Sequence, residues 1–352
     1  MRQICCRNFS AKGKKRKSRE ISPTIECEWE RVFIWDLDDT LVIFNSLIDT
    51  QYAQKFRKNP RECLNVGYEL RNIFMAIGDP HFFFQELQDC DQVHIDDLAA
   101  DDNGQDLRDY NFSTDGFLLN NNNSCNGSSG SSLMSSANTG AAVAAAAAVG
   151  LCLPPPGSTP ATGVPNISTA TAGGTTTGMR GGMDWMRKLA FRYRKIRDLY
   201  NVYKDCPESL IPQSTVNQNN IHVLASVRSE VNALTNNWVN AALRTSQLIA
   251  SRPKYANVIV TSSQISHALV KLLIFGFGST IPVENVYSSS KIGKESCFDR
   301  IQQRFGKKAT YVVVGKGHEE EAAAKTLQLP FWRISSVSDI DALHHALDLG
   351  HL

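Results

Sequence analysis

Beyond Ser251, strand-like and helix-like segments alternate to the end of the chain, and this alternation limits the possible folds more than any other feature. The runs typical of strands are 257–263, a short one near Val286, 310–315 and 331–335. The segments typical of helices are 264–275, 295–305, one that begins at Glu319, and 339–349. Such an alternation predicts an α/β fold with a doubly wound parallel sheet. Ligands of such sheets bind at the carboxyl ends of the strands. The residues that directly follow each predicted strand are therefore the candidates for a functional site.

A further strand is predicted far upstream, where the apolar run 32–35 ends at once in the acidic motif Asp36-Leu37-Asp38-Asp39-Thr40. A run that is apolar at every position is typical of a strand buried on both faces. Two more helical segments, around 183–200 and 224–248, carry apolar residues at every third or fourth position. Residues 1–29 are polar and basic, and 119–178 consist largely of Asn, Ser, Gly, Ala and Thr. We therefore predict a disordered basic tail and a disordered low-complexity loop.

The composition argues against several classes of protein. Basic and acidic residues nearly cancel, at 37 against 35, so no global charge calls for nucleic acid or an anionic membrane as partner. The cysteines include no C-x-x-C pair, which argues against a structural zinc site. The chain opens without a signal-like apolar stretch, and the small-apolar run 140–153 is too short to cross a bilayer. We expect a soluble intracellular protein, in which the basic tetrad 14–17 fits a nuclear import signal or a solvated tail equally well.

Candidate reactive groups lie next to three of the predicted strands. Asp36 and Asp38 follow the first strand, Thr261 and Ser262 end another, and Lys294 opens the helix after a third. Because the ends of parallel strands meet at one edge of a sheet, we expect these groups in one anion-binding pocket. The D-x-D-x-T motif alone is a weak signal, whereas the three segments in this order are much more specific.

The stretch 91–102 is strongly acidic but lacks the alternating ligands of a calcium loop. We expect it to form a solvated loop or a docking surface. The histidines His94, His267 and His318 are expected to be structural or surface side chains and not metal ligands.

The acidic motif resembles the first motif of the haloacid dehalogenase superfamily, and longer segments resemble the Eyes absent family in particular. These segments are 35–46, 82–110, 182–195, 291–305 and 330–335. The resemblance extends from about Glu28 to Leu352 and is interrupted by the low-complexity loop. It implies an α/β core formed by 30–45 and 251–352, with a large helical domain, 46–250, inserted after the first strand.

The resemblance also implies an activity and partners. A protein of this family is expected to be a Mg²⁺-dependent protein tyrosine phosphatase and a transcriptional coactivator, located in the nucleus and the cytoplasm. The implied partners are a sine oculis-type homeodomain protein, a Dachshund-type cofactor and a phosphotyrosine protein substrate. Neither direct DNA binding nor membrane association is expected.

By the same resemblance, Asp36 is the nucleophile that forms an aspartyl phosphate, and Asp38 is the acid and base. Ser262, or the adjacent Thr261, and Lys294 are expected to hold the phosphate oxygens. Mg²⁺ is expected on Asp36, on the backbone carbonyl of Asp38 and on a third acid. No cysteine of the chain has an arginine six positions later, so a tyrosine phosphatase with this sequence must use aspartate as its nucleophile.

The third acid of the family motif is missing from this chain. Gly315-Lys316-Gly317 stands where the family has a Gly-Asp-Gly turn, so an ammonium replaces a carboxylate. At about 4 Å and an effective dielectric near 20, repulsion between Lys316 and a divalent cation reaches roughly 8 kcal/mol. The sequence therefore predicts that Mg²⁺ binding is weakened or absent if Lys316 faces the site.

Three alternatives follow from this replacement. Glu319 or Glu320, which the family uses in a supporting shell, reaches the ion from the following helix. Alternatively, the ammonium of Lys316 takes the metal position and leaves a sluggish phosphate-binding site. In the third alternative the pocket is a relic, and the protein is an inactive nuclear cofactor scaffold. Such a scaffold would bind its homeodomain partner through the helical insertion or through the C-terminal helix around Ala342, His345 and Ala346.

Overall fold

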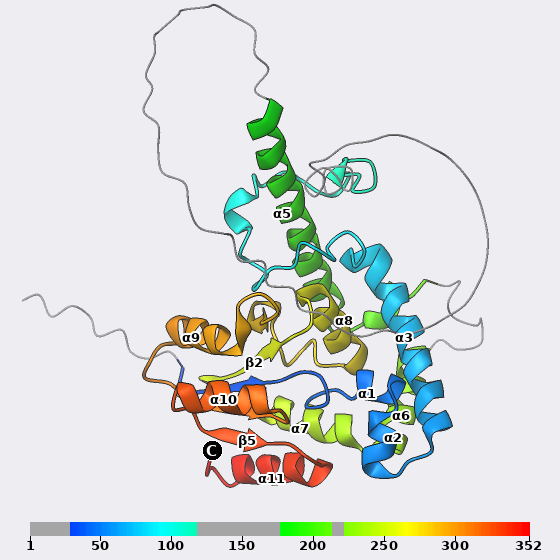
Figure 1. Ribbon diagram of the computed structural model, residues 1–352, viewed down its shortest axis with the longest axis vertical. Helices are drawn as coiled ribbons and strands as arrows, with labels where there is room; N and C mark the ends of the chain where they lie inside the picture. The colour runs from blue at the N-terminus through cyan, green and yellow to red at the C-terminus, as the bar shows by residue number, and fades with distance from the viewer. Residues whose placement is uncertain (1–28, 118–176, 213–221) are drawn as a thin grey trace, which may run out of the picture. The chain divides into compact units, whose positions relative to one another are not determined.

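The computed structural model describes residues 29–117, 177–212 and 222–352, with side chains from 183 onward in the second range (Figure 1). The predicted basic tail with its tetrad and the predicted low-complexity loop lie almost entirely outside these residues. The described residues form two compact units, one of 29–100 and 191–352 and the other of 101–117 and 177–190. The first unit contains the whole sheet. Within the described ranges, no helix combines the length and the apolar character that a membrane span requires.

A five-stranded parallel sheet forms the centre of the first unit, in the order β3-β2-β1-β4-β5. The strands are β1 (Arg31–Trp35), β2 (Tyr255–Thr261), β3 (Val286–Ser288), β4 (Thr310–Gly315) and β5 (Phe331–Arg333). Trp35 pairs with Ile259 on one side and with Val314 on the other, so the three central strands end side by side. The predicted α/β fold with a parallel sheet is confirmed.

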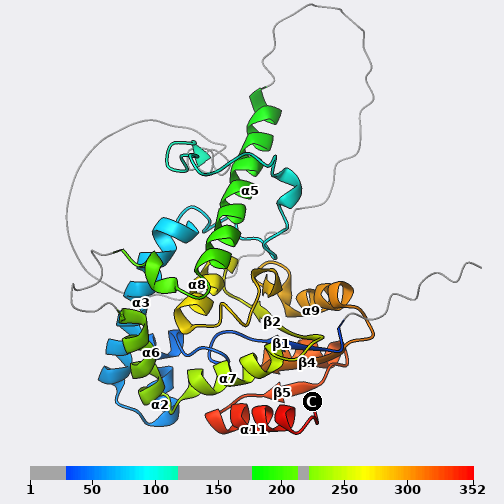
Figure 2. The same ribbon diagram turned by 180° about the vertical axis from the view of Figure 1, so that it is seen from behind.

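Helices cover both faces of this sheet. The helices that follow β2 are α8 (Ile265–Phe275), α9 (Gly293–Phe305), α10 (His318–Thr326) and α11 (Val337–Asp348), with the short η3 (Val283–Asn285) before β3. Val32, Ile34 and Val258 face a core shared with Phe298 of α9 and Ala324 of α10. On the opposite face, α11 packs against α7 (Trp238–Ala250), which in turn contacts β2. Figures 1 and 2 show α9 and α11 on opposite sides of the sheet.

All regular elements described between β1 and β2 are helical, as the predicted insertion requires. They are α1 (Asn45–Ile48), α2 (Gln51–Phe56), α3 (Pro60–Phe82), η1 (Ala99–Asp101), α5 (Thr177–Tyr203), η2 (Pro207–Leu210), α6 (Val223–Leu234) and α7. The prediction of a single helical segment over 224–248 is wrong in one respect, because the structure has two helices there, α6 and α7. Asn236 and Asn237 adopt left-handed backbone conformations that interrupt it, and asparagine tolerates these better than most residues. The exact domain boundaries stay a prediction.

The acidic stretch, for which a solvated loop or a docking surface was predicted, begins with a buried carboxylate. Asp91 is 5% exposed, and its Oδ1 accepts from the backbone N–H of Ile265 at the amino end of α8 over 3.1 Å. Its Oδ2 accepts from Ser288 Oγ over 2.7 Å and from Ser290 Oγ over 3.0 Å. The positive end of the α8 dipole and three donors therefore replace the water that composition alone suggested.

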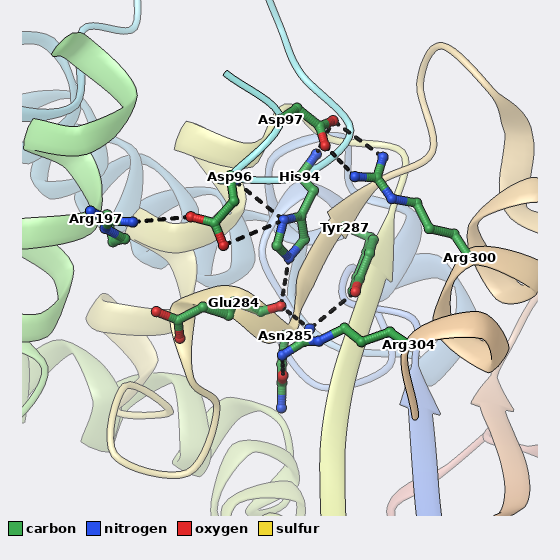
Figure 3. Close-up of polar contacts among 9 residues, drawn as sticks. All are labelled: His94, Asp96, Asp97, Arg197, Glu284, Asn285, Tyr287, Arg300 and Arg304. Atoms are coloured by element: carbon green, nitrogen blue, oxygen red, sulfur yellow. Dashed lines mark hydrogen bonds and ion pairs between the residues drawn. The ribbon is translucent and has the colours of Figure 1, made fainter. Parts of the chain in front are cut away.

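The next part of this stretch is held by arginines from two helices (Figure 3). Asp97 pairs with Arg300 of α9 and also accepts from the backbone N–H of His94 over 3.0 Å. Asp96 pairs with Arg197 of α5 over 3.1 Å. His94 is buried, which lowers its pKa, and its Nε2 donates to a backbone carbonyl, that of Glu284, over 2.7 Å. The predicted solvated loop is thus corrected for residues 91–97, and His94 has a structural position as predicted.

Candidate active site

Asp36 directly follows β1 at the carboxyl edge of the sheet. Its backbone N–H donates to Val314 O over 2.9 Å, which extends the pairing of β1 with β4 by one residue. Lys294, in the first turn of α9, donates from Nζ to Asp36 Oδ1 over 3.1 Å, and Thr40 Oγ1 donates to Oδ2 over 3.1 Å. The structure thus brings Asp36 and Lys294 into direct contact, as the convergence of strand ends predicts.

The Asp36 carboxyl is almost fully enclosed by protein. Burial is the largest influence on this group and raises its pKa above the ordinary value. Lys294 opposes that rise, Asp38 adds to it, and the hydroxyl of Thr40 opposes it more weakly. Because burial and a specific charge partner act together on a side chain at the ligand-binding edge of the sheet, Asp36 is a strong candidate for a reactive group.

The carboxylate of Asp38 contacts α8 instead of Lys294. Lys271 Nζ donates to its Oδ1 over 2.7 Å and to its Oδ2 over 2.9 Å, and Ser263 Oγ donates to Oδ2 over 3.0 Å. Lys271 Nζ also contacts Ser263 Oγ over 3.2 Å. The Asp38 carboxylate therefore cannot turn toward a substrate without breaking its hydrogen bonds with the buried ammonium of Lys271.

Sequence reasoning missed Lys271 as a site residue, although the sequence contains a signal. Lys271 lies in the segment Ile265–Phe275, whose remaining positions are almost all apolar and buried. A lysine in a helix that is buried on nearly every face needs a carboxylate partner. The sequence does not show which carboxylate that is.

The three hydroxyl residues at the carboxyl end of β2, Thr261, Ser262 and Ser263, lie in different environments. Thr261 is buried, and its Oγ1 accepts from the backbone N–H of Ser263 over 3.1 Å. Ser262 is exposed, and Ser263 contacts Asp38. An exposed hydroxyl at the strand end is free to meet an incoming ligand, so the phosphate-binding role of Ser262 stays a prediction.

Glu320 of α10 completes a buried charge cluster with Lys294. Its Oε1 pairs with Lys294 Nζ, and the residue is 5% exposed. Among the described residues, its Oε2 is buried and has no hydrogen-bond partner. A Cβ at position 317 would meet Oε2, so a larger residue there would require this carboxylate to move. Glu319, which was predicted for the same supporting role, is exposed.

Lys316 pairs with Asp39 of the loop that follows β1. Its Nζ contacts Asp39 Oδ2, and Ser46 Oγ donates to Oδ1 of the same carboxylate. Arg333 of β5 donates to the backbone carbonyl of Lys316 over 3.2 Å and so holds the turn at its other side. Lys316 keeps 40% of its side chain exposed, which places its ammonium at the rim of the pocket.

The residues present do not fit the Mg²⁺ that the family resemblance implies. Magnesium requires several oxygen ligands in octahedral geometry. Both carboxylate oxygens of Asp36 are engaged by Lys294 and Thr40, and Lys316 stands where the resemblance implies the third acid. Glu320 offers a buried oxygen without a partner, but Lys294 contacts the same carboxylate. Across the part of the chain that the structure describes, no group of three or more acidic, His or Cys side chains could hold a metal ion.

Acid is expected to destabilise the fold through His267 of α8. The ring stacks on Phe84 with centroids 4.0 Å apart, and its Nδ1 is buried without a hydrogen-bond partner among the described residues. Burial lowers its pKa to about 4, with a smaller contribution from Lys271. The unfolded chain takes up a proton near pH 6.5, so this contribution to stability is fully present above that pH and is lost as the pH falls toward 4. After allowance for partial exposure, we expect a loss of roughly 2 kcal/mol.

His267→Phe is expected to lose less stability than the wild type between pH 7 and pH 4.5. Urea unfolding at the two pH values measures the change. The matched control is His345→Phe on α11, where the ring is exposed. An equal loss in His267→Phe and the wild type would show that another group carries the acid sensitivity.

Comparison with known proteins identifies relatives of the chain. No family model matches the chain. It is 43% identical over 323 residues to protein phosphatase eya of Drosophila melanogaster, covering 92% of this chain and 36% of that protein. It is 41% identical over 341 residues to human protein phosphatase EYA2, covering 97% of this chain and 54% of that protein. It is 45% identical over 125 residues to protein phosphatase EYA3 of Gallus gallus, covering 35% of this chain and 100% of that sequence. The chain thus spans 36% and 54% of the lengths of the fly and human relatives.

Proposed function

Because this chain belongs to the Eyes absent (Eya) family of protein phosphatases, we propose that its pocket hydrolyses phosphate monoesters, phosphotyrosine in protein substrates above all. The observation that carries this proposal is the contact of Asp36 with Lys294 at the carboxyl edge of the sheet. A buried carboxylate beside an ammonium provides both a nucleophile and a charge partner for the phosphoryl oxygens.

In the proposed reaction, an oxygen of Asp36 attacks phosphorus while the bond to the tyrosine oxygen breaks. Asp38 gives a proton to that leaving oxygen and later takes one from the water that hydrolyses the aspartyl phosphate. Lys294 and Ser262, or the adjacent Thr261, hold the phosphate oxygens. Lys271 keeps Asp38 in place and must release it during each turnover, because it contacts both of its oxygens.

We expect turnover to be slow. The resemblance implies Mg²⁺ as a source of positive charge, and the residues present do not fit that ion. Phosphoryl transfer depends largely on positioning and on charge stabilisation, so an ammonium that is paired with Asp39 at the rim stabilises the reacting phosphoryl group less than a divalent ion beside Asp36 would.

Asp36→Asn is expected to lower the hydrolysis of an aryl phosphate by at least about a hundredfold, because an amide is a poor nucleophile. Rates are measured with the wild type and the variant, in EDTA and in Mg²⁺. Asp299→Asn, which removes an exposed carboxylate on α9, is the matched control and should leave the rate unchanged. Equal rates for Asp36→Asn and the wild type would end the proposal of an aspartate-dependent phosphatase.

A second candidate function is favoured by Lys316, which stands in an otherwise complete α/β core. In this alternative the protein is an inactive nuclear cofactor scaffold that binds a sine oculis-type homeodomain protein, without contacting DNA itself. On α11, Ala342 and His345 are exposed, whereas Leu343 and Leu347 are buried against the core. That exposed face suits a partner.

A pull-down with a sine oculis-type domain should therefore succeed with the wild type and weaken with Ala342→Arg. Failure of the wild type to bind removes this candidate function.

A further inference from the structure

The charges around the candidate site nearly balance without a metal ion. Its carboxylates, Asp36, Asp38, Asp39 and Glu320, face the ammonium groups of Lys271, Lys294 and Lys316. Four negative and three positive groups leave a formal charge of −1. If position 316 were the acid of the family motif, the same pocket would carry −3, and a bound divalent cation would return it to −1. Lysine at position 316 therefore supplies the same formal change in charge as the ion.

The turn that carries Lys316 lies directly against the reactive carboxylate. A Cβ at Gly315 would be 3.5 Å from Cβ of Asp36 and 3.0 Å from Cγ of Glu320, so the backbone of the turn is in close contact with both. From this turn, Lys316 reaches Asp39, three residues after Asp36 in the same loop. The ammonium is thereby paired with the loop that follows Asp36, at Asp39.

The ammonium of Lys316 also remains available to a ligand. It borders a small cavity whose lining includes Asp39, Lys55 and Trp238 but neither Asp36 nor Lys294. An ammonium has three N–H donors, and Asp39 takes one of them among the contacts of the described residues. Lys294 contacts Asp36 directly from α9, and Lys316 reaches the same loop from the end of β4 through Asp39.

We propose that this site binds a phosphoryl dianion without a divalent cation, with the ammonium groups of Lys316 and Lys294 as its positive charges. The inference rests on the proposed phosphoryl site, but it concerns binding and does not require turnover. The ligand class is a phosphate monoester or inorganic phosphate, because both present a compact dianion to two point charges.

The test is a titration with inorganic phosphate, followed by ³¹P NMR, in EDTA and again in Mg²⁺. The wild type should bind phosphate in EDTA, and Mg²⁺ should change its affinity by less than about threefold. Lys316→Asp should bind phosphate at least about tenfold more weakly in EDTA, because one attraction becomes a repulsion. Mg²⁺ should restore binding to that variant.

Two further variants make the result specific. Lys316→Met should bind weakly in EDTA and gain nothing from Mg²⁺, because it lacks both the ammonium and the acid. Lys254→Asp makes the same change in charge at the amino end of β2, on an exposed side chain, and should bind like the wild type. Thermal unfolding confirms that each variant is folded.

The proposal is overturned if the wild type does not bind phosphate in EDTA, if Mg²⁺ raises its affinity tenfold or more, or if Lys316→Asp binds equally well in EDTA. Failure of the proposed phosphatase is a separate result. Phosphate binding in EDTA by a wild type that hydrolyses no faster than Asp36→Asn would remove the enzyme and keep the anion site.

Discussion

Lys316→Asp is expected to bind Mg²⁺ at least about tenfold more tightly than the wild type. The substitution removes a positive charge and adds a negative one next to Asp36, in a turn that is packed against that carboxylate. At about 4 Å and an effective dielectric near 20, each unit charge pair is worth about 4 kcal/mol. The substitution removes a repulsion of roughly 8 kcal/mol from the divalent ion and adds an attraction of similar size. Even a third of this sum, roughly 5 kcal/mol, would raise the affinity for Mg²⁺ more than a thousandfold. Isothermal titration with MgCl₂ measures it directly.

The rate of aryl phosphate hydrolysis in Mg²⁺ should rise with this affinity, again by at least about tenfold, since the added ion stabilises charge on the transferring group. Lys254→Asp is the matched control, and we expect it to have the wild-type affinity and rate. If the wild type already binds Mg²⁺ as tightly as Lys316→Asp, then the electrostatic argument about position 316 is wrong. The pair of Lys316 with Asp39 would then hold the ammonium too far from the ion to matter.

The sequence predicts those parts of the site that follow from backbone geometry. Asp36 and Lys294 are 258 positions apart, yet they meet because each follows a parallel strand of the same sheet. The alternation of strands and helices after Ser251 predicts which residues lie at the carboxyl edge of the sheet. The strands and helices of the structure, from β2 to α11, follow this predicted alternation closely. The position of Lys316 at the end of β4 is predictable for the same reason.

Contacts that depend on the reach of side chains could not be predicted in this way. Asp38 lies two residues from Asp36, but its partner is Lys271 on a helix, and nothing in the spacing distinguishes Lys271 from Lys294. Likewise, the ammonium of Lys316 had several carboxylates within reach of its turn and pairs with Asp39. The choice among equivalent charges depends on rotamers and packing, which a sequence pattern does not contain.

The acidic stretch shows a second limit of sequence reasoning. Its composition is typical of a solvated loop, because unpaired carboxylates favour water. Asp91, however, meets the amino end of α8 and the hydroxyl of Ser288, and Asp97 meets Arg300 (Figure 3). These donors come from elements far along the chain, so the stretch is buried only because the fold supplies them.

Lys271→Met is expected to destabilise the protein by about 3 kcal/mol, because it leaves the Asp38 carboxylate without its main partner in a low-dielectric site. The Lys271 side chain is 4% exposed and that of Asp38 21%, which places the expected loss at the lower end for a broken buried ion pair. Methionine matches the length of the lysine stem, so the loss reports the charge and its hydrogen bonds and not a cavity. Urea unfolding at pH 7 measures the free energy of unfolding.

The double variant Lys271→Met with Asp38→Asn should recover at least about half of that loss, because the unpaired charge is then removed as well. Lys325→Met is the matched control, since Lys325 forms an ion pair with Glu321 while 74% of its side chain is exposed. Exposed pairs contribute at most about 1 kcal/mol, so this variant should unfold almost like the wild type. If Lys271→Met were no more destabilising than Lys325→Met, Asp38 would not depend on the buried ammonium. It would then be free to turn toward a substrate, and Lys271 would not be the group that restrains the proposed acid.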